Sequence, residues 1–85
     1  MLKLEDVKEF LRIDHDNEDG YLLSLRNLAK EVCENYLREP LPIESIVSIR
    51  QAQLLVVAHF YENRGDSQIP DAVYRLLDSY RKEVF

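Results

Sequence analysis

The chain has 85 residues, 46% of them hydrophobic and 32% charged, and this composition is typical of one soluble globular domain, here spanning residues 1–85. Its single cysteine excludes an intramolecular disulfide framework and a multi-cysteine zinc site. Sixteen acidic against eleven basic residues give a net charge of −5, which argues against tight wrapping of DNA or RNA.

The apolar residues recur at helical spacing, and the turn-forming residues divide the chain into four segments. A polar turn over residues 14–20 separates the first two segments, and Pro40 and Pro42 close the second, because proline lacks the N–H that a continuing helix needs. Gly65 is well placed to end the third segment in the left-handed conformation. We therefore predict an all-α fold, a compact bundle of four helices with short loops and no strand: about residues 4–12, 18–37, 44–63 and 70–82.

The third segment is apolar on more than one side. Its centre, residues 54–61, could also form a buried strand, but apolar residues at helical spacing upstream favour a helix. A helix of this kind is either central in its own domain or partly covered by a partner, and the composition leaves both open. The predicted assembly interface is one of its two apolar stripes, made of Val47, Leu54, Ala58 and Tyr61.

The sequence does not predict a membrane span. Its longest apolar run, residues 54–61, has eight residues, whereas crossing a bilayer takes roughly 20. We expect a protein that is made and kept in a reducing, cytoplasm-like compartment.

The acidic turn is the first candidate for chemistry, because its oxygens suit a hard cation such as calcium. Counted from Asp14, however, the position that needs glycine holds Asp19, and the position that needs a bidentate glutamate holds Leu25. The turn is therefore better explained as a solvated loop whose acids suit the positive start of the next helix.

The remaining candidates do not form a catalytic pattern. His15 and His59 are far apart in the sequence, and His59 and Cys33 lie among apolar residues, where packed side chains are expected. The basic residues near the end, Arg75, Arg81 and Lys82, could contact phosphate, but acids are interleaved with them, so a salt-bridged exposed face is the simpler interpretation. We predict no catalytic residue, no cofactor and no metal site.

Four stretches resemble, in order, one family of small proteins. They are LEDVKEFLRID at residues 4–14, ENY at 34–36, QAQLLVVAHFYENR at 51–64, and IP, LL and YR at 69–70, 76–77 and 80–81. The chain is similar in these stretches to the small helical head–tail connector proteins of tailed bacteriophages and prophages, which are also described as DNA-packaging or head-completion proteins. The loops at residues 38–43 and 65–68 are shorter than in many members.

The resemblance implies a non-catalytic structural role in the virion, at the portal vertex, for a protein made in the bacterial cytoplasm. About a dozen copies would form a ring beneath the portal protein, extend the DNA tunnel and dock the next head-completion or tail protein. Genome DNA would pass without specific binding, and no membrane would be involved. The alternative is a small helical interaction adaptor or regulator that acts as a monomer or dimer; an enzyme fits less well.

Overall fold

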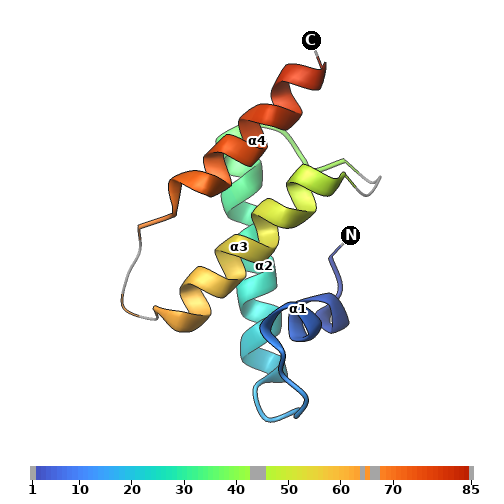
Figure 1. Ribbon diagram of the computed structural model, residues 1–85, viewed down its shortest axis with the longest axis vertical. Helices are drawn as coiled ribbons and strands as arrows, with labels where there is room; N and C mark the ends of the chain where they lie inside the picture. The colour runs from blue at the N-terminus through green and yellow to red at the C-terminus, as the bar shows by residue number, and fades with distance from the viewer. Residues whose placement is uncertain (1, 43–45, 64, 66–67, 85) are drawn as a thin grey trace.

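The computed structural model describes residues 2–42, 46–63, 65 and 68–84, without the side chains of residues 82–84. Within this part of the chain it contains no strand and four helices: α1 (Leu4–Leu11), α2 (Asp19–Leu37), α3 (Val47–Glu62) and α4 (Asp71–Val84) (Figure 1). The predicted all-α bundle is confirmed. The predicted start of the third helix at residue 44 lies outside the described residues.

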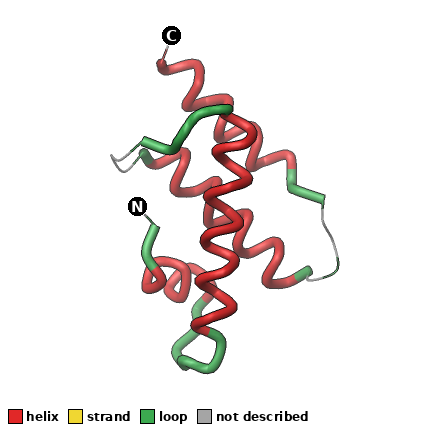
Figure 2. Tube along the Cα trace, turned by 180° about the vertical axis from the view of Figure 1, so that it is seen from behind, coloured by secondary structure: helices red, strands yellow, loops and turns green. Residues whose placement is uncertain are grey.

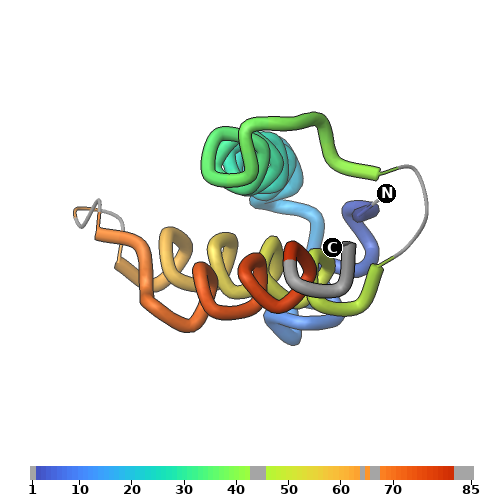
Figure 3. The backbone as a smooth tube through the Cα atoms, turned by 90° about the horizontal axis from the view of Figure 1, so that it is seen from above, coloured from blue at the N-terminus to red at the C-terminus, as the bar shows by residue number. Residues whose placement is uncertain are grey.

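The helices form two layers. Seen from above, α2 lies in one layer and crosses over α3 and α4, which run side by side in the other (Figure 3). The short helix α1 lies beside the first half of α2 and also contacts α3 (Figure 2). Helix α3 therefore contacts all three other helices, whereas the described parts of α1 and α4 do not touch each other.

The core is aliphatic, and each helix contributes to it at helical spacing. Helix α2 buries Leu22, Leu25 and Ala29, and α4 buries Val73 and Leu77, as expected for residues three or four positions apart on one face. Removal of these side chains from water is the main stabilising contribution, at roughly 25 cal/mol per Å² of apolar surface. This packing fixes α3 in the centre of the fold.

Two helices end at arginines in the left-handed conformation. Arg12 follows α1 and Arg38 follows α2, each with a φ of 59°, and their backbone N–H groups donate to carbonyls of the last helical turn. The predicted left-handed cap at Gly65 is wrong, because α3 ends earlier, at Glu62. There Asn63 is the cap, and both its backbone N–H and its side-chain amide donate to the carbonyl of His59, at 2.9 and 3.1 Å.

One polar side chain interrupts the described core. Gln53, in the middle of α3, is only 7% exposed. Its neighbours at helical spacing, Ile49, Val56 and Val57, are all buried and apolar. Gln53 is therefore a polar residue at a position of α3 that faces the apolar core.

Candidate assembly surface

The four residues of the predicted interface lie in different surroundings. Val47 begins α3 and is 80% exposed, whereas Leu54 is only 5% exposed. Ala58 and Tyr61 are half-buried. A spacing of seven residues puts Val47 and Leu54 on the same side of α3, but neighbouring elements cover that side at Leu54 and leave it open at Val47.

Helix α1 and the start of α2 lie next to Leu54. Arg50, one turn before Leu54, and Tyr61, two turns after it, contact these elements. Arg50 forms an ion pair with Asp6 of α1, with 3.2 Å between Nη2 and Oδ1. Tyr61 donates a 2.8 Å hydrogen bond from its hydroxyl to Glu18, which caps the start of α2. Its ring also packs near that of Tyr21, at 6.4 Å between centroids. Leu54 and Tyr61 therefore serve the packing of the chain itself.

The more exposed side of α3 carries a different set of residues, which we call the open stripe. Ala58 and Leu55, which also packs against the core, are partly exposed, and the remaining members are exposed. Their spacing of three or four residues places them along one line of the helix. The open stripe consists of Val47, Gln51, Leu55, Ala58 and Glu62. It shares Val47 and Ala58 with the predicted interface, and sequence reasoning missed Leu55, although its spacing from Gln51 and Ala58 was visible.

A second exposed apolar residue lies on α1. Phe10 is 39% exposed, although it lies only three residues after the buried Val7. It lies one turn after Asp6, and therefore on the side of α1 that pairs with Arg50 of α3. The hydrogen bond from Arg50, with a second from the backbone N–H of Lys3, lowers the pKa of Asp6.

The acidic turn holds the ammonium group of Lys8. Lys8 Nζ lies 2.7 Å from Asp16 Oδ1 and 2.9 Å from Asp19 Oδ1, which ties α1 to the start of α2. The hydrogen bonds that Lys8 donates to Asp16 and Asp19 raise the pKa of Lys8, and the bond that Asp16 accepts lowers the pKa of Asp16. Across the described ranges no group of three histidine, cysteine or acidic side chains lies close enough to hold a metal ion.

The basic residues near the end of the chain were predicted to form a salt-bridged exposed face, but Arg81 of α4 contacts Tyr36 of α2 instead. Arg81 donates a hydrogen bond to the backbone carbonyl of Tyr36, and its guanidinium lies 5.0 Å from the centre of that ring. The Tyr36 hydroxyl donates to Asp78 at 2.8 Å, and this hydrogen bond raises the pKa of Tyr36. Arg81 and Asp78 therefore fasten α4 to the end of α2. Arg75 is exposed, and the side chain of Lys82 lies outside the described residues.

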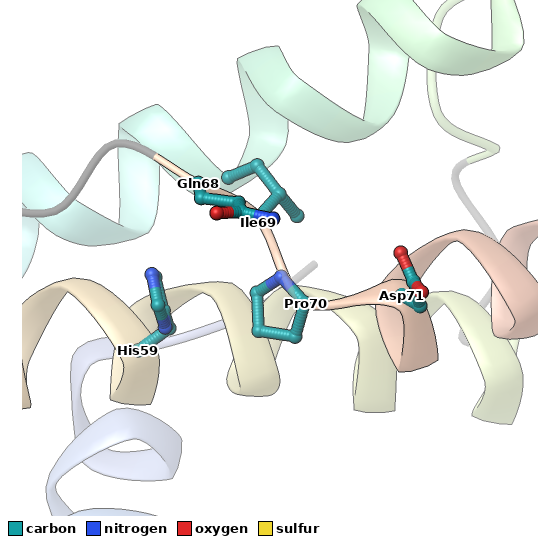
Figure 4. A pocket seen from close by; sticks show the side chains of 5 residues that line it. All are labelled: His59, Gln68, Ile69, Pro70 and Asp71. Atoms are coloured by element: carbon teal, nitrogen blue, oxygen red, sulfur yellow. The ribbon is translucent and has the colours of Figure 1, made fainter.

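The two candidate nucleophile or base residues do not meet. Cys33 is completely buried, and burial raises the pKa of its thiol to about 11, so it remains neutral at pH 7. His59 is on α3 and packs edge-on against Phe60. It lines a shallow pocket of about 240 Å³ with Gln68, Ile69, Pro70 and Asp71. In that pocket Pro70 lies between the imidazole and the carboxylate of Asp71, which points away (Figure 4). These residues therefore form no acid–base pair.

None of the helices, as far as the structure describes them, has both the length and the apolar character that crossing a bilayer requires.

Comparison with known proteins gives one match. A family model described as "Phage gp6-like head-tail connector protein" matches residues 1–84 of the chain. Neither the curated proteins nor the solved structures contain a match to the chain.

Proposed function

The chain belongs to the family of phage gp6-like head–tail connector proteins, and from that premise we propose that it is a non-catalytic structural part of a phage or prophage connector. In this role a single helical domain forms a ring of about a dozen copies under the portal protein. The ring extends the DNA tunnel and docks the next head-completion or tail protein at the portal vertex of the virion. The observation that carries the proposal is the family match over residues 1–84.

The ring contact is assigned to α3. Of the predicted residues, Val47 and Ala58 lie on the open stripe, and Leu55 joins them there. Leu54 and Tyr61 lie on the adjoining side and support the stripe from within the chain. A contact between the open stripe and a different surface of the next copy is heterologous, and repeated contacts of that type close into a ring when the rotation allows.

The charge supports a lining through which DNA slides. A protein with net charge −5 lacks the excess of Lys and Arg that neutralises phosphates and produces strong, salt-sensitive binding. Arg81 is engaged with Tyr36 within the chain, which leaves fewer of its N–H groups for a phosphate contact. DNA can then pass the ring without being retained.

The test is the absolute mass in solution, measured by light scattering over a wide range of protein concentration, first alone and then with the cognate portal protein. A species of about a dozen copies, alone or on the portal, is the expected result. A dimer whose mass does not change with concentration and that does not bind the portal protein would overturn the proposal and favour the adaptor alternative. A monomer that does not bind the portal would overturn it as well.

A further inference from the structure

Residues 2–11, which comprise α1 and the residues before it, are attached to the rest of the chain by ion pairs and apolar packing. Asp6 pairs with Arg50 on α3, and Lys8 pairs with Asp16 and with Asp19 at the start of α2. Leu2 and Val7 are buried, and Leu4 and Leu11 are partly buried against the core. We call residues 2–11 the arm.

We propose that the arm exchanges between copies, so that α1 of one chain docks on α2 and α3 of the next. The proposal rests on the self-assembly proposed above and adds a second contact between neighbours, beside the open stripe of α3. The occupant of the docking surface is the arm of a second copy, because the surface already fits that sequence: Arg50 and Asp19 meet Asp6 and Lys8 with opposite charges. Exchange of an identical element keeps the contacts that the arm makes with α2 and α3 and gives up those that involve the link, such as the ion pair of Lys8 with Asp16, and is therefore a low-cost route to assembly.

The link between the arm and α2 permits the exchange. It consists of residues 12–18, in which Asp14, His15, Asp16 and Asn17 are all exposed. An extended link of this length spans roughly 25 Å, similar to the 27 Å intermediate dimension of the molecule. The extended link can therefore reach an adjacent copy.

The conformation of the link favours release. The arm folds back because Arg12 takes a left-handed conformation, with φ of 59°, which a residue with a side chain adopts reluctantly. A change of Arg12 to extended backbone removes that strain and directs the arm outward. In addition, 39% of Phe10 remains exposed in the closed chain, so the arm has apolar surface that its own chain does not bury.

Exchange also has the geometry that a ring needs. The arm and its docking surface are different parts of the chain, so each copy can give its arm to one neighbour and receive one from the other. A contact of this kind is heterologous and propagates from copy to copy.

The experiment uses charge reversal on either side of the docking contact. One full-length variant reverses the arm, Asp6→Arg with Lys8→Glu, and another reverses the docking surface, Arg50→Asp with Asp19→Lys. Within each variant, like charges face each other between the arm and the docking surface. Opposite charges face each other only when the arm of one variant docks on the surface of the other, in a mixed, exchanged assembly. The control carries all four changes in one chain, which restores both pairs internally. Asp16→Asn is present in every chain compared, including the reference chain, because Asp16 also pairs with Lys8.

The readout is the average mass by light scattering, before and after the two variants are mixed. We expect mixing to raise the average mass about twofold or more, and to give assemblies that contain both variants. The control should have the mass of the wild type. If the wild type assembles but mixing leaves the mass of the variants unchanged, arm exchange is wrong while the proposed ring stands. If the wild type does not assemble even on the portal, the proposed function fails first.

A second variant covers the case in which the reversed chains do not fold. Deletion of residues 14–17 shortens the link to three residues, so the arm no longer reaches its own docking surface. The expected product is an oligomer with wild-type helicity by circular dichroism. A monomer that has lost the helicity of α1 would overturn the proposal, because the arm would then have failed to dock on the free docking surface of a second copy.

Discussion

The hydroxyl of Tyr36, near the end of α2, donates a 2.8 Å hydrogen bond to Asp78 on α4, across 42 residues of sequence. Arg81 covers the face of the same ring and donates to the Tyr36 carbonyl. The ring of Tyr74 packs against it, with centroids 4.7 Å apart. One tyrosine therefore connects the end of α2 to three residues of α4.

Tyr36→Phe should lower the melting temperature by about 5 °C. The change keeps the ring and leaves the Asp78 carboxylate without its donor in a partly buried place, and one such hydrogen bond is worth several degrees in a domain of this size. Thermal unfolding followed by circular dichroism measures the effect. Tyr74→Phe is the matched control, since it removes a hydroxyl but retains the contact between the two rings. Equal losses in the two variants would contradict the assigned role of the hydrogen bond.

The melting temperature should fall as the pH drops below about 4. Asp6 and Asp16 have lower pKa values in the folded chain than in the unfolded chain, because Arg50 and Lys8 bind their ionised forms. The unfolded chain thus takes up protons first, so these pairs contribute stability above the unfolded pKa and lose it as the pH falls through the folded pKa. Asp6→Asn should lower the melting temperature by about 2–4 °C at pH 7. It should also make the melting temperature depend less on pH in the acid range. Asp14→Asn, at an exposed residue of the acidic turn, should leave the curve nearly unchanged.

Arg38→Gly should raise the free energy of unfolding by about 0.5–1 kcal/mol. Arg38 holds a left-handed backbone at the end of α2, and glycine adopts that conformation without steric strain, although it also adds freedom to the unfolded chain. Urea unfolding provides the measurement. Arg38→Ala removes the same side chain but keeps the strained conformation, so it should give no gain. A stabilised alanine variant would show that the arginine side chain, and not its backbone, is unfavourable.

Gln53→Met should stabilise the chain by about 1 kcal/mol. The substitution keeps the volume and replaces a polar side chain at a buried position of α3 with an apolar one. The same change at the exposed Gln51 should alter stability by less than about 0.5 kcal/mol. Both are read from urea unfolding at unchanged m-value. A destabilised Gln53→Met chain would indicate that the amide has a partner in the folded state.

Val47→Asp and Leu54→Asp should separate assembly from folding. Val47 is exposed on the open stripe, so its replacement should abolish the ring while leaving helicity intact. Leu54 is in the core, and a carboxylate there should destabilise the chain by about 3–5 kcal/mol and unfold it. Light scattering and circular dichroism on both variants are the measurements. A Val47→Asp chain that still forms the ring would move the interface away from the open stripe.

The periodicity of the sequence predicted the four helices because their inner faces are aliphatic at regular spacing, as Val73 and Leu77 illustrate. It did not predict which side of α3 stays open. Val47 and Leu54 are both aliphatic and lie on the same side of α3. Only the positions of α1 and α2 determine that Leu54 is buried and Val47 is exposed. The left-handed turns were missed for a similar reason. Composition suggests glycine for such turns, but the packing of α1 and α2 fixes where the chain must reverse, and arginine stands at both places.

The separation of α1 from α4 has a consequence for the motions of the folded chain. Both helices pack on α2 and α3, but the described parts of the two do not touch. Local opening of either one therefore leaves the contacts of the other in place, and the two openings carry separate free energies. Amide hydrogen exchange should then show two independent units at the ends of the chain, around a slower central pair. A partner that captures one end of the chain would leave the other end free to exchange at its own rate.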